Sequence, residues 1–199
     1  MSTTETSTER RVLRPATLDL GDIVLRPWGR ALDVPGGTVP ALMAAAADPV
    51  IDRWNPLRIA DPAGAEAYLD RCDTGWVKGN RASFAITDAA DGTLHGNAFL
   101  GWTNQEDGVA TIGYWLLPTA RGRGIATRAT TAVTRWAVAT ADARRIELWH
   151  GVGNEASCRV AARGGFPHEG TTRASYRYGD GDYVDEHLHA RLATDPDVG

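Results

Sequence analysis

The alternation of apolar and polar positions divides the first half of the chain into a strand and two helices. An apolar, β-branched run at residues 22–28 predicts an opening strand. Two stretches at 39–47 and 61–79 have the length and composition of helices, and the second begins with Asp-Pro and ends at a glycine. The residues between these helices, 51–58, follow no such period and predict a loop.

The next part of the chain predicts a hairpin followed by a crossover. Two strand patterns flank the dipeptide Asp91-Gly92, which is typical of a β-hairpin. Residues 108–118 are apolar on both faces, which indicates a central strand. The Ala-rich segment 124–140 and the apolar segment 144–151 follow it as helix and strand. Strand, helix and strand in this order predict a parallel βαβ connection.

The last part of the chain predicts one more helix and two more strands. Asn154 and the pair Gly164-Gly165 delimit a short helix, and 166–173 and 182–192 have strand patterns. No repeat or low-complexity linker divides the chain. The pattern therefore predicts an α/β (α+β) fold with a mixed central sheet of about seven strands, mostly antiparallel with a parallel βαβ crossover, flanked by helices.

Length and composition agree with one domain. A chain of 199 residues with 43% hydrophobic and 23% charged residues can bury one substantial core. The formal net charge of −4 gives no global basic field, so direct nucleic-acid binding is not expected. The polar ends predict disordered tails at 1–11 and 194–199 around a single domain at 12–193.

The chain carries no sequence signal for a membrane segment or a metal site. It has no long apolar run and no apolar signal-peptide core, and Cys72 and Cys158 lack CxxC spacing, so we expect a cytoplasmic protein without disulfides. His187 and His189 share one face of a predicted strand, but without a third ligand at suitable spacing they predict a packed or solvated pair. His150 is interpreted as a core histidine, Cys158 as a packing residue, and no metal is predicted.

The turn RGRGIA, at residues 121–126, has the composition of an anion site. It delivers a strand into a helix, whose first amide groups are unpaired and whose dipole adds roughly half a positive charge. Gly122 and Gly124 remove the Cβ atoms that would keep a phosphate away from the backbone, and Arg121 and Arg123 add formal charge. The predicted ligand is a pyrophosphate.

Several kinds of phosphate site can be compared with this turn. A Walker loop ends in Gly-Lys-Ser/Thr, whereas Ile125 and Ala126 follow Gly124 here. A dinucleotide fingerprint needs a third glycine where Thr127 stands. What remains is the pattern Arg-x-x-Gly-x-Ala directly after the strand that ends in GYWLLP; a generic phosphate-binding α/β domain stays open as a broader alternative.

With these pieces the chain resembles the GNAT superfamily of acyl-CoA N-acyltransferases, and more narrowly its RimJ/RimL-type branch of ribosomal-protein N-terminal acetyltransferases. IGYWLLPTARGRGIATRA at 112–129 and NEASCRVAARGGF at 154–166 carry the resemblance, which covers most of the chain. It implies a GNAT fold and an enzyme that moves an acetyl group from acetyl-CoA to a primary amine by direct attack in a ternary complex. The branch favours a protein N-terminal α-amine. A small amine such as an antibiotic or a polyamine, and a non-catalytic acyl-CoA sensor, stay open as alternatives.

The resemblance also implies individual roles. Ser157 matches the serine of the family's Asn-x-x-Ser motif and is the implied catalytic acid near the CoA sulfur, while Asn154 would contact the pantetheine arm, cap its helix, or do both. The implied cofactor-binding residues are Trp115, Leu116 and Leu117 along the arm, Arg121, Gly122, Arg123, Gly124, Ile125 and Ala126 around the pyrophosphate, and Asn154.

The general base stays open, because Thr111 stands where many members of the family carry a glutamate. Glu106, Asp107 and Glu147 are nearby carboxylates, and water alone could relay the proton. The missing strand carboxylate is the reason for keeping the sensor alternative. Related proteins commonly form dimers, so a homodimer is a further expectation, and neither a membrane nor a nucleic acid is an expected partner.

Overall fold

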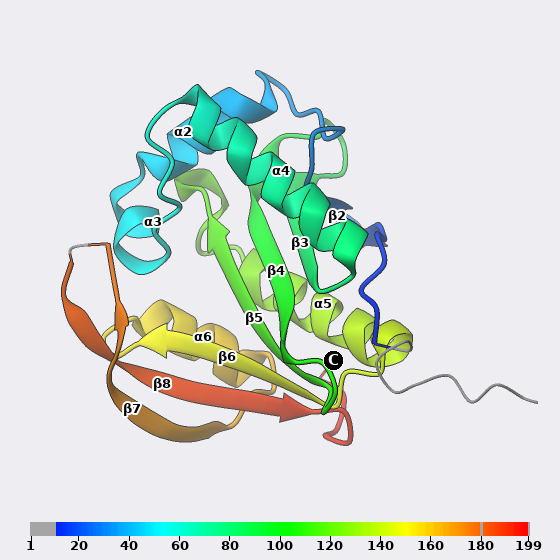
Figure 1. The fold of residues 1–199 in the computed structure, drawn as a ribbon, viewed down its shortest axis with the longest axis vertical. Helices are drawn as coiled ribbons and strands as arrows, with labels where there is room; N and C mark the ends of the chain where they lie inside the picture. The colour runs from blue at the N-terminus through cyan, green and yellow to red at the C-terminus, as the bar shows by residue number, and fades with distance from the viewer. Residues whose placement is uncertain (1–10, 180, 199) are drawn as a thin grey trace, which may run out of the picture.

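A single open sheet organises the protein in the computed structural model, which describes residues 11–179 and 181–198 (Figure 1). Within that part of the chain the sheet has eight strands in the order β1-β2-β3-β4-β5-β6-β8-β7. All neighbours are antiparallel except β5 and β6. The strands are β1 (Leu18–Asp19), β2 (Ile23–Pro27), β3 (Arg81–Asp88), β4 (Leu94–Asn104), β5 (Val109–Leu116), β6 (Arg145–Gly151), β7 (His168–Arg177) and β8 (Tyr183–Leu192).

Helices cover both faces of this sheet. They are α2 (Thr38–Ala46), α3 (Pro49–Trp54), α4 (Pro62–Lys78), the short 3₁₀ helix η1 (Pro118–Ala120), α5 (Ile125–Ala141) and α6 (Glu155–Arg163). The helix α5 makes the crossover between the two parallel strands. Among the described residues no helix is long and apolar enough to cross a membrane.

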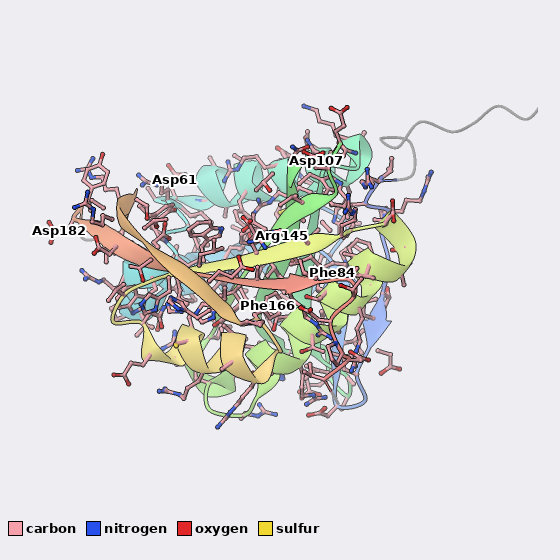
Figure 2. All side chains as sticks on the ribbon, turned by 90° about the horizontal axis from the view of Figure 1, so that it is seen from below. Asp61, Phe84, Asp107, Arg145, Phe166 and Asp182 are labelled. Atoms are coloured by element: carbon pink, nitrogen blue, oxygen red, sulfur yellow. The ribbon has the colours of Figure 1, made fainter. Side chains whose placement is uncertain are left out.

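Two hydrophobic cores lie on the two faces of the sheet, because successive strand side chains point in opposite directions. In β3, Phe84 and Ile86 share a core with residues of α5 and α6 and with Trp76 at the end of α4, whereas Ala85 shares the other core with residues of α2, α3 and the rest of α4. Figure 2 labels the buried Phe84 and Phe166 together with Asp61, Asp107 and Asp182, three exposed aspartates at the outer edge of the molecule.

The expected elements are present, with two local differences. A helix, α3, occupies part of the expected loop 51–58, because the carboxylate of Asp48 accepts the amides of Val50 and Ile51 and Pro49 stands in the first turn. This cap lies outside the apolar period that predicts helices. The short strand β1 pairs with β2 and brings the sheet to eight strands.

Single described residues of the two expected tails make ion pairs with the domain. Arg11 is buried, and its guanidinium lies 3.0 Å from the carboxylate of Asp142. Near the other end, Asp197 pairs with Arg135 of α5 at 2.8 Å and with Arg191 of β8 at 3.1 Å. The expectation of disordered tails at 1–11 and 194–199 stays a prediction, because residues 1–10 and 199 lie outside the described residues.

We expect Phe84→Leu to lower the free energy of unfolding by about 2 kcal/mol. The fully buried Phe84 ring makes edge-to-face contacts with Trp76 and Trp136, with ring centres 5.1 Å and 5.2 Å apart. Leucine would lose both contacts and leave a cavity. Urea unfolding measures the change. Val77→Ala is the control, because Val77 is 87% exposed and its truncation should change stability by less than about 0.5 kcal/mol. Equal changes in the two variants would contradict this assignment of the core.

Candidate active site

The parallel strands β5 and β6 separate halfway along their length, as Figure 1 shows. They pair from Val109 opposite Arg145 to Ile112 opposite Leu148. Beyond that point β5 stays paired with β4, and β6 stays paired with β8. Each strand therefore has one edge that faces the gap, where its backbone polar groups need other partners.

A cavity of about 310 Å³ lies at this gap. Its walls come from the diverging ends of β5 and β6, from α3, from the RGRGIA turn, from the first turn of α5 and from one side of α6 along its length. Segments that are far apart in sequence thus meet around one space. Of the residues expected to bind a cofactor, those on its wall are Trp115, Leu116, Arg121, Gly122, Gly124, Ile125, Ala126 and Asn154.

The RGRGIA turn has the backbone geometry of an anion cradle. Gly122 and Gly124 have φ values of 75° and 73°, a left-handed conformation that favours glycine, and a Cβ on either would point into open space. Gly124 is the N-cap of α5 and offers no side-chain acceptor, and the first turn of α5 contains no acidic residue. The first amides of α5 and the positive end of its dipole are therefore available to an anion.

Arg121 is held inside the protein by two contacts. Its Nε donates to the carbonyl oxygen of Leu116 at 3.1 Å, and its guanidinium pairs with the carboxylate of Asp48. Burial alone would raise the pKa of Asp48, but hydrogen bonds from Arg121 and the amides of Ile51 and Val50 outweigh it, and the pKa is lowered from its ordinary value. Arg121 thus ties the turn to the first turn of α3.

Other basic residues surround the cavity. Arg159 and Arg163, one turn apart on α6, line it together with Arg121, and among the described residues no aspartate or glutamate lies on its wall. This charge suits a phosphate-bearing ligand. Arg123 and Leu117 lie off the wall; the amide of Leu117 donates to the carbonyl of His95 at 2.8 Å, which fixes the end of β5.

A pair of hydroxyl groups bridges the gap between β5 and α6. The phenol of Tyr114 donates to Ser157 Oγ at 2.9 Å. Asn154 caps α6, and its side-chain oxygen accepts the amide of Ser157 at 3.2 Å. Burial raises the pKa of Tyr114 to about 12, against a smaller opposite effect of the bond to Ser157. Tyr114 is therefore protonated at neutral pH, and the Ser157 hydroxyl keeps its own proton for another acceptor.

Sequence reasoning missed Tyr114, although it lies within the strand motif. Its neighbour Trp115 points to the opposite face of the sheet. There it lies in the core that contains Ala85, with its ring centre 6.4 Å from that of Trp28. The alternation along β5 is the signal that separates them, because it sends Tyr114 toward the face on which α6 lies. Only the position of α6 shows that Ser157 is its partner.

The three carboxylates considered as general bases lie away from the cavity wall. Glu106 and Asp107 belong to the turn before β5, at the opposite end of that strand from the cavity. Glu147 accepts hydrogen bonds from Arg145 Nε at 2.9 Å and from Trp149 Nε1 at 3.2 Å. None of these three carboxylates therefore reaches the gap between β5 and β6.

Comparisons with known proteins identify related acetyltransferases. Residues 22–167 match the family described as Acetyltransferase (GNAT) domain. YdaF from Bacillus subtilis (strain 168), to which a ribosomal N-acetyltransferase activity is attributed, is 31% identical over 132 residues, covering 65% of this chain and 68% of YdaF.

Solved structures show the same fold. The ribosomal-protein-S5-alanine acetyltransferase from Vibrio fischeri superposes with a TM-score of 0.77 at 20% identity, covering 90% of this chain and 98% of that one. RimL, a ribosomal L7/L12 alpha-N-protein acetyltransferase in complex with coenzyme A, superposes with a TM-score of 0.76 at 22% identity, covering 89% and 98%.

The ion pair between Arg121 and Asp48 should make stability depend on pH. Asp48→Asn keeps an N-cap residue but removes the charge, so we expect a loss of about 1 to 2 kcal/mol at pH 7. The pKa of Asp48 is lower in the folded protein than in the unfolded chain. The ionised carboxylate therefore contributes fully to the free energy of unfolding above the unfolded pKa of about 3.9, and this contribution is lost as the pH falls through the folded pKa.

Melting temperatures of the parent and Asp48→Asn between pH 7 and pH 3 test this. The difference should be constant down to about pH 5 and should shrink below about pH 4. Asp52→Asn removes an exposed carboxylate from the same helix and serves as the control. A difference for Asp48→Asn that stays constant to pH 3 would contradict the assignment.

Proposed function

The chain belongs to the GNAT acetyltransferase family, and from that premise we propose that it moves an acetyl group from acetyl-CoA to a primary amine by direct attack in a ternary complex. One observation carries the proposal: the gap between β5 and β6 opens into the uncapped, glycine-rich start of α5. A free backbone edge for a peptide-like arm and a cradle for a pyrophosphate thus lie in one space.

The residues on the cavity wall fit acetyl-CoA. Gly122, Gly124, Ile125 and Ala126 would hold the pyrophosphate through backbone amides, with Arg159 and Arg163 adding charge. Trp115 and Leu116, with Asn154 across the gap, would flank the pantetheine arm. Arg121 would act chiefly by fixing the RGRGIA turn through its ion pair with Asp48. Arg123 is exposed and would meet acetyl-CoA only at phosphate groups outside the cavity.

The chemistry follows from the Tyr114–Ser157 pair. The neutral amine attacks the thioester carbonyl carbon, the C–S bond breaks, and the leaving thiolate takes the proton of the Ser157 hydroxyl. Tyr114 gives its phenol proton to Ser157 and regains one from water. Backbone amides on the free edge of β5 would stabilise the oxyanion. The proton that the amine loses goes to water, since no carboxylate among the described residues lines the cavity.

A protein N-terminal α-amine is the proposed acceptor. Its pKa near 8, against about 10.4 for a lysine, leaves more of it neutral at pH 7, which suits a site without a carboxylate base. The ribosomal N-acetyltransferase activity attributed to YdaF supports the same class. A cationic antibiotic or polyamine would be repelled by the arginines around the cavity. The hydroxyl pair favours catalysis over a sensor role.

The proposal extends to the compartment. Cys72 and Cys158 are both free thiols, as in the reducing cytoplasm where ribosomal proteins are made. The homodimer stays a prediction.

Acetyl-CoA should raise the melting temperature, whereas ATP and NAD at the same concentration should raise it less. A ligand at about 100 times its dissociation constant adds about 2.7 kcal/mol to the stability of the folded state. Gly122→Ala should weaken this response, because its Cβ enters the open side of the cradle. Gly153→Ala is the matched control: Gly153 also has a positive φ and open space, but it lies off the cavity wall. An equal shift with ATP would refute a CoA site.

Ser157→Ala should lower kcat by about 100-fold while the Kd for acetyl-CoA changes less than about two-fold, because only the acid is removed. Release of free thiol, measured with a peptide bearing a free N-terminus, gives the rate. The same peptide with an acetylated N-terminus and an internal lysine tests the acceptor class. Tyr114→Phe should show a smaller loss than Ser157→Ala, and parental kinetics in Ser157→Ala would exclude the serine as the acid.

A further inference from the structure

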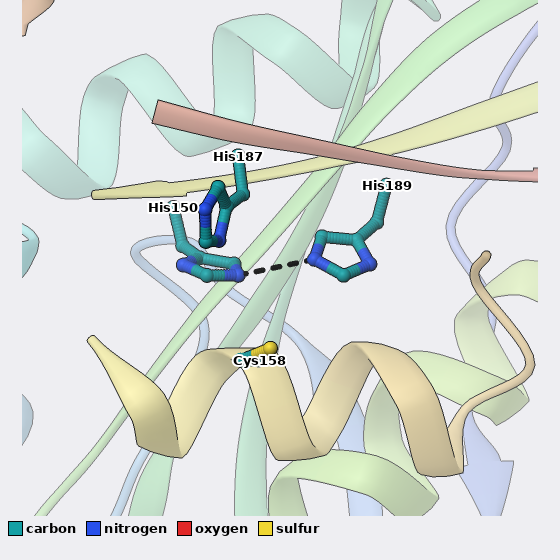
Figure 3. A group of neighbouring side chains, drawn as sticks. All are labelled: His150, Cys158, His187 and His189. Carbon is teal, nitrogen blue, oxygen red and sulfur yellow. Dashed lines mark hydrogen bonds between the residues drawn. The ribbon is translucent and has the colours of Figure 1, made fainter. Parts of the chain in front are cut away.

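Four of the five histidines gather on one face of neighbouring strands. The register places His150 of β6 opposite His187 of β8, and His189 of β8 opposite His168 of β7. Cys158 approaches the same place from α6, which lies across these strands (Figure 3). The sequence shows only the pair on β8; the strand register and the position of α6 supply the other members.

Three of these histidines and the cysteine are close enough to share an ion. One ligand atom from each of His150, Cys158, His187 and His189 lies within 4.8 Å of all the others. His150 Nε2 lies 3.3 Å from His189 Nε2. Two nitrogens bound to one tetrahedral Zn²⁺ at about 2.0 to 2.1 Å are about 3.3 to 3.4 Å apart, so this pair already has the spacing of metal ligands.

The other ring nitrogens of this pair are oriented by the backbone. His150 Nδ1 lies 3.1 Å from the carbonyl oxygen of Gly151, and His189 Nδ1 lies 3.0 Å from that of Phe166. A carbonyl oxygen only accepts, so each Nδ1 carries a proton and each Nε2 of a neutral ring carries a lone pair. Two lone pairs then face each other, which a cation between them would relieve. Imidazoles whose second nitrogen donates to a backbone carbonyl are typical of metal ligands.

The remaining two residues complete the group. His187 Nδ1 is buried and has no hydrogen-bond partner among the described residues. Cys158 is a free thiol on the side of α6 that faces the strands (Figure 3). A thiolate and imidazole nitrogens are the donors that Zn²⁺ prefers, and the lack of a carboxylate in the group makes Mg²⁺ and Ca²⁺ poor candidates.

We propose that His150, Cys158, His187 and His189 form a binding site for one Zn²⁺ ion. The Cys158 thiol loses its proton on binding, and the ion takes three nitrogens and one sulfur. Because four protein ligands fill a tetrahedral shell, the ion has no open position for water and acts as a structural link. It would join α6 to β6 and β8 beside Ser157, the neighbour of Cys158, and thereby fix the wall of the cavity.

The test uses the full-length protein freed of metal with a chelator. Titration with Zn²⁺ against a chromophoric competitor should give one ion per chain with a Kd below about 1 μM. Co²⁺ in place of Zn²⁺ should give the intense visible bands of a tetrahedral ion and a thiolate-to-metal charge-transfer band. A Co²⁺ spectrum without the thiolate band, or a stoichiometry near zero, would overturn the proposal.

Matched variants separate this site from chance binding to histidines. Cys158→Ser and His187→Gln should each weaken Zn²⁺ binding by at least about 100-fold. Cys72→Ser removes the other cysteine, and His168→Gln removes an exposed histidine whose ring centre lies 4.8 Å from that of His187; both should bind within about three-fold of the parent. Undiminished binding by folded Cys158→Ser would refute the site. If a variant fails to fold, the Co²⁺ spectrum of the parent still shows whether a cysteine thiolate binds the ion.

Discussion

The parting of β5 and β6 after Ile112 and Leu148 is the constraint on which the rest of the structure depends. Both strands keep their outer partners, so the two halves of the sheet stay rigid while their inner edges separate. An unpaired edge inside a protein is costly, and part of the cost is met by Asn55, whose amide donates to the carbonyl of Tyr114 at 2.9 Å. In the proposed function the rest of this edge pairs with the pantetheine arm of acetyl-CoA.

This gap also determines what its neighbours can do. The chain leaves β5 at the gap and enters α5 through the RGRGIA turn, so the uncapped helix start points into the same space. It leaves β6 on the other side of the gap and enters α6 after three connecting residues, which places Ser157 opposite Tyr114. The hydroxyl pair and the uncapped, glycine-rich helix start therefore face one opening because of the strand lengths and the short connections that follow them.

Local sequence patterns predicted most of this architecture, because each helix, strand and turn concerned is recognisable from residues that are close together in sequence. The apolar run of β5, the glycines of the turn and the Asn-x-x-Ser start of α6 are each visible within a few residues. The contacts that sequence reasoning missed join residues far apart in the chain: Asp48 and Arg121 are 73 positions apart, and Tyr114 and Ser157 are 43 apart.

The helix α3 was missed because six residues are too few to show a helical period, and the N-cap at its start is the signal that would have found it. Leu117 and Arg123 fall within the motif yet lie off the cavity wall, because a motif fixes backbone shape better than side-chain direction.

The group of His150, Cys158, His187 and His189 likewise depends on positions far apart in sequence, because β6, β8 and α6 must all be in register to bring it together. His150 belongs both to the cavity wall and to this group, and Cys158 directly follows Ser157 on α6. Burial against the sheet alone leaves α6 weakly fixed, since Ala161 is its one fully buried residue. A helix with so small a core contact needs polar anchors. The Asn154 cap and the bond from Tyr114 to Ser157 anchor the first turn of α6, and the proposed ion would add a third anchor there through Cys158.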